Sequence, residues 1–193
     1  MDHKLIRTFV AVPIPDSVIE LQKFLQCTID LKRGPIKWVR SDQLHLTLKF
    51  IGDTPESSFD DIRYLLDCIA NKTRPIQLRI KETGCFPKKE RPRVMWTGIS
   101  GETGQLNNLV TEIQSGLDLL GFYNDEKSYH PHITLGRTQY PQKHTPNLSR
   151  FLETVYEPIP FVIEKFQFIS SELFPNGPVY TILSTHFFGN NSV

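Results

Sequence analysis

Two histidines in this chain each stand two residues before a threonine, in segments that are otherwise apolar. The first motif is His45-Leu46-Thr47-Leu48, and the second is His132-Ile133-Thr134-Leu135. Imidazole titrates close to neutral pH, so one ring can accept a proton while another donates one. Threonine hydroxyls can hydrogen-bond the non-bridging oxygens of a phosphate. The pair of motifs therefore indicates acid–base chemistry at a phosphorus atom.

Hydrolysis of a strained cyclic phosphate needs two such imidazoles on opposite sides of the phosphorus. A base on one side activates water, and an acid on the other side protonates the departing ribose oxygen, because phosphoryl transfer proceeds in line. Arg137, five residues beyond His132, could neutralise charge on the phosphate oxygens. This scheme requires no metal or other cofactor, so we expect none.

Simpler interpretations of the same residues remain open. A strand histidine beside a threonine is usually structural. A zinc site would need the two motif histidines to join Asp53 or Glu90, which do not have ligand-motif spacing. His130 should share the face of His132 and is a further candidate for substrate binding. His186 is expected to be an ordinary surface histidine.

Residues 44–51 alternate between apolar and polar side chains, which predicts a strand with one buried face. The apolar set is expected to face the core: Leu44, Leu46, Leu48 and Phe50. The polar set is expected to face the other way: His45, Thr47 and Lys49. Residues 132–137 repeat this alternation, so each motif should present its histidine and threonine on one polar face.

The two motifs belong to a wider internal repeat. They are 87 residues apart, and Phe86-Pro87 recurs 88 residues later as Phe174-Pro175. Several landmarks in one order at nearly one offset indicate two related units, roughly 1–92 and 93–187.

The order of predicted elements favours an α+β fold. We predict a bilobal, duplicated arrangement in which two antiparallel β-sheets face a central cleft, with helices on the outer faces. The whole chain, 1–193, is expected to form one bilobal domain whose last strand returns to the first lobe.

Composition excludes several classes of protein. The 193 residues carry 22 basic and 21 acidic side chains, a net charge of +1, whereas proteins that coat long nucleic acids are usually more basic. The sequence contains no apolar run of the length that a membrane span needs, so no membrane association is expected. Its three cysteines lack metal-site spacing and are expected to be free thiols in a reducing cytoplasm.

At these motifs the sequence resembles the 2H phosphoesterase superfamily, and within it the RNA 2′,3′-cyclic phosphodiesterases of the 2′-5′ RNA ligase family (LigT-like). The resemblance spans nearly the whole chain. Besides the two motifs it rests on these segments: 7–12, 37–39, 49–52, 86–87, 92–96, 136–137, 171–174 and 179–180. It implies two antiparallel sheets around a basic cleft. It also implies metal-independent opening of a 2′,3′-cyclic phosphate at an RNA or nucleotide end to leave a 2′-phosphate.

The resemblance also implies roles for individual residues. His45 would be the general acid toward the 3′ oxygen, and His132 the general base on water. Thr47 and Thr134 would bind phosphate, and Arg137 would assist at the phosphate or the base. Pseudo-symmetry makes the acid and base roles easy to exchange. Joining of RNA ends through a 2′-5′ linkage is the reverse of ring opening and would use the same histidines.

Two aromatic residues are candidates for stacking on a nucleobase, namely Phe9 and Trp38, although a role in the strand core is an equal alternative for both. Gly136 departs from the alanine that many relatives carry before the motif's arginine. We do not expect this difference to disable the site.

The expected partners are RNA 3′ ends or nucleoside 2′,3′-cyclic phosphates, and the protein is expected to be a monomer. One alternative function is a non-catalytic module that binds nucleotides or RNA ends. Another is a cyclic phosphodiesterase that acts on an ADP-ribose cyclic phosphate.

Overall fold

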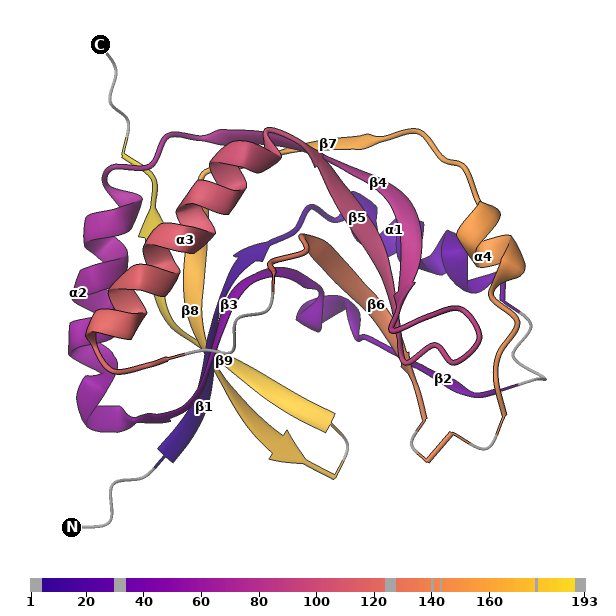
Figure 1. Ribbon diagram of the computed structural model, residues 1–193, viewed down its shortest axis with the longest axis horizontal. Helices are drawn as coiled ribbons and strands as arrows, with labels where there is room; N and C mark the ends of the chain where they lie inside the picture. The colour runs from indigo at the N-terminus through magenta and orange to yellow at the C-terminus, as the bar shows by residue number, and fades with distance from the viewer. Residues whose placement is uncertain are drawn as a thin grey trace.

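The computed structural model describes residues 5–29, 34–123, 128–139, 141–142, 144–175 and 177–189 (Figure 1). The helices in these ranges are α1 (Ser17–Gln26), α2 (Phe59–Ala70), α3 (Thr103–Leu119) and α4 (Ser149–Glu153), with short 3₁₀ turns at Ser41–Gln43 and Glu56–Ser58. The strands are β1 (Leu5–Pro13), β2 (Ile36–Trp38), β3 (His45–Pro55), β4 (Ile76–Phe86), β5 (Val94–Gly101), β6 (His132–Thr138), β7 (Ile159–Ile163), β8 (Lys165–Phe174) and β9 (Gly177–Phe187).

The strands are joined in the order β7-β4-β5-β6-β3-β1-β8-β9, with β2 added beside β6. Every pairing is antiparallel. One half of this sheet is formed by β7, β4, β5, β6 and β2, and the other half by β3, β1, β8 and β9. Among the described residues, the two halves are paired where Leu46 of β3 lies opposite Ile133 of β6. The expectation of an α+β fold with antiparallel strands is confirmed. The two sheets expected from the sequence are connected through this one residue pair.

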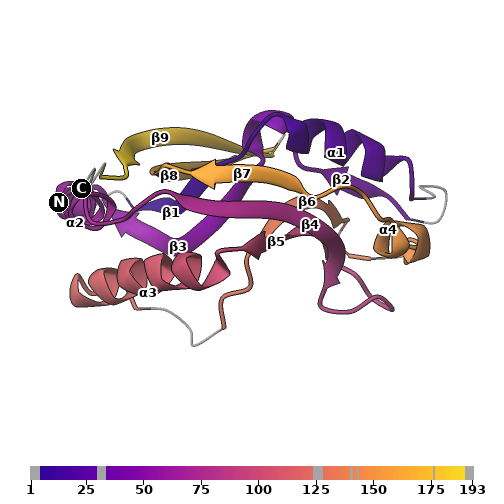
Figure 2. The same ribbon diagram turned by 90° about the horizontal axis from the view of Figure 1, so that it is seen from above.

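Apolar stripes on the helices explain where they pack. On α2, Phe59, Ile62 and Leu66 are buried at helical spacing, and on α3 Leu106 and Ile113 are fully buried. Figure 1 shows α2 and α3 side by side at one end of the molecule, with α1 and α4 at the other end. Seen from above, α1 and α3 lie on opposite sides of the strands (Figure 2).

A β-bulge interrupts the expected alternation on β3. Thr47 pairs with Ala11 of β1 and Lys49 pairs with Val10, so Leu48 has no partner across the ladder. The extra residue reverses the facing of Lys49 and Phe50, and a second irregularity follows at Ile51. Lys49 is therefore buried and Phe50 is 43% exposed, so the prediction that Phe50 faces the core and Lys49 faces outward was wrong.

The second motif carries a bulge at the equivalent place. On β6, Thr134 pairs with Trp96 of β5 and Gly136 pairs with Met95, so Leu135 has no partner in the ladder with β5. Arg137 then lies on the exposed face, as Phe50 does in the first motif. In both motifs the bulge follows the threonine and re-aims the residue that stands five positions after the histidine.

His186, on β9, is 1% exposed, so the prediction that it is a surface histidine was wrong. Its Nδ1 lies 2.6 Å from Asp67 Oδ1 on α2, and its Nε2 lies 2.8 Å from Ser184 Oγ. A buried imidazole needs such partners for both ring nitrogens. The contacts fasten α2 to the outer strand of the sheet.

No helix within the described ranges is long and apolar enough to cross a membrane.

Candidate active site

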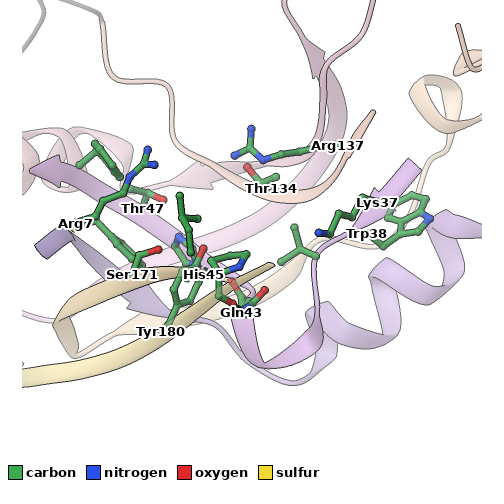
Figure 3. A pocket seen from close by; sticks show the side chains of 15 residues that line it. Arg7, Lys37, Trp38, Gln43, His45, Thr47, Thr134, Arg137, Ser171 and Tyr180 are labelled. Atoms are coloured by element: carbon green, nitrogen blue, oxygen red, sulfur yellow. Dashed lines mark hydrogen bonds between the residues drawn. The ribbon is translucent and has the colours of Figure 1, made fainter. Parts of the chain in front are cut away.

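A cavity of about 490 Å³ lies over the junction of the two halves (Figure 3). Six of the residues predicted from the sequence line it: Phe9, Trp38, His45, Thr47, Thr134 and Arg137. A volume of this size is within the range of pockets that bind small molecules. Neither His132 nor His130 is among the residues that line this cavity. His132 is the first residue of β6, and His130 lies two residues before that strand.

The two motifs are arranged symmetrically about the pair that joins the halves. Leu46 and Ile133 are fully buried, and they lie opposite each other across β3 and β6. Because strand side chains alternate, the histidine and threonine on either side of each buried residue face the opposite way. Continuing the antiparallel register brings the histidine of each motif across from the threonine of the other. The two imidazoles therefore approach one region from two sides.

Each imidazole is held by the same main-chain contact. Nδ1 of His45 lies 2.7 Å from the carbonyl oxygen of Gln43, and Nδ1 of His132 lies 2.7 Å from that of His130. A carbonyl oxygen only accepts hydrogen bonds, so Nδ1 must be the donor in both rings. This leaves Nε2 of each histidine as the atom that can exchange a proton with a substrate.

Aromatic rings fix the position of the His45 ring. The Phe9 ring centroid lies 5.0 Å from that of His45, and the Tyr180 centroid lies 5.6 Å away in an edge-on arrangement. The Gln43 side chain donates a hydrogen bond to the Pro178 carbonyl in the β8–β9 hairpin. The loop before β3 and this hairpin are therefore tied together beside the first imidazole.

The His132 ring lies against a different set of aromatic side chains. Phe86 lies 5.1 Å away edge-on, Trp96 lies 6.1 Å away, and His130 lies 6.2 Å away. Gly84 makes room for the indole, since a Cβ atom there would come within 2.1 Å of Trp96 Cζ2. His45 and His132 hold equivalent positions in the two motifs, but the aromatic side chains packed against them differ.

Burial lowers the pKa of both motif histidines below the ordinary value of 6.5. The carbonyls of Gln43 and His130 act in the opposite direction by stabilising the charged rings. The positive charge of Arg137 further lowers the pKa of both His45 and His132, and protonated His132 lowers that of His45. Both imidazoles therefore lie within electrostatic reach of one guanidinium.

The structure places the three remaining predicted binding residues, Phe9, Trp38 and His130, in different surroundings. Phe9 is 3% exposed and packs on His45, which favours the strand-core interpretation over stacking on a base. Trp38 lines the cavity but also packs on the main core. A Cβ at Gly136 would lie 3.0 Å from Trp38 Cε3, so the glycine leaves space for this ring. His130 is exposed and supports His132 through its carbonyl.

Sequence reasoning did not predict that several further residues line the cavity, among them Arg7, Lys37, Gln43 and Tyr180. Gln43 had a visible signal, since it stands two residues before His45 as His130 stands before His132. The others come from strands distant in the sequence, and their convergence depends on the folded sheet.

The described part of the chain contains no group of three or more histidine, cysteine, aspartate or glutamate side chains placed to hold a metal ion.

The large antiparallel sheet and the two His-x-Thr motifs define the class of protein. A model of the 2′-5′ RNA ligase superfamily matches residues 22–173, and the chain belongs to this family. The resemblance seen in the sequence is thereby confirmed.

Individual relatives agree with this assignment. The chain is 32% identical over 188 residues to an RNA 2′,3′-cyclic phosphodiesterase of Aquifex aeolicus (strain VF5), covering 96% of this chain and 99% of the relative. The crystal structure of TT0787 of Thermus thermophilus is similar with a TM-score of 0.80 at 31% identity, covering 96% and 100% of the two chains. Escherichia coli LigT complexed with 3′-AMP shares the fold at 22% identity, with a TM-score of 0.75 and coverage of 95% and 98%.

Proposed function

We propose that this protein hydrolyses 2′,3′-cyclic phosphates at RNA or nucleotide ends to 2′-phosphates by two-histidine acid–base catalysis. Two kinds of evidence support the proposal. Relatives that match nearly the full length of the chain are named RNA 2′,3′-cyclic phosphodiesterases. The observation that carries it in this chain is that the imidazoles of His45 and His132 are each oriented by a contact from Nδ1 to a carbonyl, with His45 lining the cavity and His132 on the paired strand β6.

In the proposed reaction, Nε2 of His132 takes a proton from water as the water oxygen bonds to phosphorus. The bond between phosphorus and the 3′ oxygen breaks on the opposite side, and His45 Nε2–H gives its proton to that oxygen. Thr47 and Thr134 donate hydrogen bonds to the non-bridging oxygens. Arg137 neutralises the negative charge that grows on them.

The general acid must be protonated when the substrate binds, although burial lowers the pKa of His45. A bound phosphate supplies a negative charge close to both rings and offsets the charge of Arg137, which raises the pKa of a nearby histidine. The near-symmetry of the site allows the two histidines to exchange roles. The same groups would serve the reverse reaction, in which a 2′-5′ linkage is formed.

Phosphorus NMR of the products from adenosine 2′,3′-cyclic phosphate, in excess EDTA, tests the proposal. The expected result is complete conversion to the 2′-monophosphate with no loss of rate in EDTA. Tight binding without turnover would contradict hydrolysis and favour a binding module. Loss of activity in EDTA that zinc restores would contradict the metal-independent mechanism. Faster turnover of an ADP-ribose cyclic phosphate than of any nucleotide would assign a different substrate.

We also propose that residues 1–193 form one bilobal domain of two related units that acts as a cytoplasmic monomer. The equivalent bulges after Thr47 and Thr134 support the duplication. Both motifs lie on a single chain, so one copy supplies a complete pair of histidines. Free thiols at Cys27, Cys68 and Cys85 are consistent with a reducing compartment.

A further inference from the structure

The cavity has more positive charge than the reacting phosphate accounts for. Of the described residues that line it, Arg7, Lys37 and Arg137 are cationic and none is acidic. Arg137 follows the second motif on β6, whereas Arg7 is on β1. In Figure 3 the side chains of Arg7 and Arg137 reach toward the cavity on the Thr47 side and the Thr134 side respectively. The two guanidiniums therefore belong to different halves of the molecule.

The equivalent bulges relate these two arginines. Arg137 stands five residues after His132, and Phe50 holds the same place after His45. Each is turned to the exposed face by the bulge before it. Arg7 covers the Phe50 ring, with Cζ 4.6 Å from the ring centroid. Phe50 on β3 and Arg137 on β6 thus hold equivalent positions, and Arg7 of the neighbouring strand β1 lies over Phe50.

Arg7 is set away from the reacting groups. Its Cα is about 13 Å along β1 from Ala11, the residue that pairs with Thr47. The charge of Arg137 lowers the pKa of both motif histidines, and the charges of Arg137 and Arg7 both act to lower the pKa of Tyr180, which burial raises. With one face of its guanidinium on Phe50, Arg7 keeps its edge N–H groups for a planar, bidentate contact with an anion.

We propose that Arg7, stacked on Phe50, binds the phosphodiester that precedes the terminal nucleotide. The preferred substrate is then an RNA end of at least two nucleotides rather than a mononucleotide. This inference rests on the proposed hydrolysis of cyclic phosphates and specifies its substrate.

The test compares two substrates, adenosine 2′,3′-cyclic phosphate and the dinucleotide ApA with a 2′,3′-cyclic phosphate at its 3′ end. The wild type should show a kcat/KM for the dinucleotide at least about 10-fold higher, the scale of one charge-assisted hydrogen bond. Arg7→Gln should lose about 10- to 100-fold on the dinucleotide and change less than about 2-fold on the mononucleotide. Arg7→Lys should keep part of the preference, because it retains the charge.

Arg63→Gln is the matched control. Arg63 also lies over a phenylalanine, with Cζ 5.8 Å from the Phe59 ring centroid, but on α2 and outside the cavity. This variant should behave as the wild type on both substrates. In the wild type, added salt should reduce kcat/KM more steeply for the dinucleotide than for the mononucleotide. This comparison holds even if Arg7→Gln fails to fold.

Three results would overturn the inference: no wild-type preference for the dinucleotide, a preference that survives Arg7→Gln, or an equal loss on both substrates. The last would place Arg7 at the reacting phosphate. Each leaves mononucleotide hydrolysis by the wild type, and with it the proposed function, intact. If the wild type opens neither substrate, the proposed function fails and this inference fails with it.

Discussion

His45 and His132 are anchored identically, because Nδ1 of each imidazole lies 2.7 Å from the main-chain carbonyl oxygen two residues earlier in the chain. The two contacts lie on different strands, 87 residues apart in sequence. The backbone therefore sets the orientation of both rings before any substrate binds, and it sets the same proton position in both.

The anchoring predicts the tautomer of both rings. When neutral, His45 and His132 should carry their proton on Nδ1, because a carbonyl cannot donate. Long-range ¹H–¹⁵N NMR of the free protein above the pKa of both rings distinguishes the two nitrogens. A protonated Nδ1 and a bare Nε2 are expected for both residues. An Nε2–H tautomer in either ring would contradict the proton-transfer scheme.

Arg137→Gln should shift the pH dependence of catalysis upward. The positive charge of Arg137 lowers the pKa of both His45 and His132, so its removal raises both. Both limbs of the kcat/KM profile should then move to higher pH, and the rate at the optimum should fall by about 100-fold from lost charge stabilisation. Arg7→Gln, measured alongside on the mononucleotide, should leave the limbs in place. Unmoved limbs in Arg137→Gln would contradict the electrostatic coupling.

Gly84→Ala should destabilise the protein and disturb the site of His132. The added Cβ would come within 2.1 Å of Trp96 Cζ2, and the indole is one of the rings against which His132 lies. Overpacking of this kind costs about 1–3 kcal/mol. At Gly104 on α3, nothing lies within 4 Å of an added Cβ, so Gly104→Ala is the control and should not destabilise. Thermal unfolding of the two variants gives the comparison, and equal melting temperatures would contradict it.

His186→Ala should reduce the free energy of unfolding by about 2–3 kcal/mol, since it removes a buried ring and leaves its hydrogen-bond partners unmatched. His186 is 1% exposed and lies between Asp67 and Ser184. His144 is exposed, and His144→Ala should change stability by less than about 0.5 kcal/mol. Urea unfolding checks both values. An unchanged free energy of unfolding in His186→Ala would show that these contacts do not hold α2 to β9.

The sequence was sufficient to predict the α+β fold and to find the two motifs. Period-two alternation placed Leu46 and Ile133 in the core, and both are fully buried. It failed after Leu48, because a bulge depends on which strand lies alongside, and that strand is β1, distant in the sequence. The same bulge is what exposes Phe50.

The electrostatic surroundings of the site could not be predicted from the sequence for a related reason. Tyr180 and Arg7 come from β9 and β1, and no spacing within their own segments indicates that both reach this cavity. His186 was expected at the surface, but β9 places it beside Asp67 of α2. Local pattern identifies residues within one strand, whereas their neighbours depend on strand order.

The central claim is that two imidazoles act on one phosphorus atom, and single-turnover hydrolysis of adenosine 2′,3′-cyclic phosphate by His45→Ala, His132→Ala and the double variant tests it most directly. Each single variant should lose at least about 100-fold in rate. The double variant should lose little more than the worse single variant, because an acid and a base that act in one step fail together. A near-normal rate in either single variant would contradict the account.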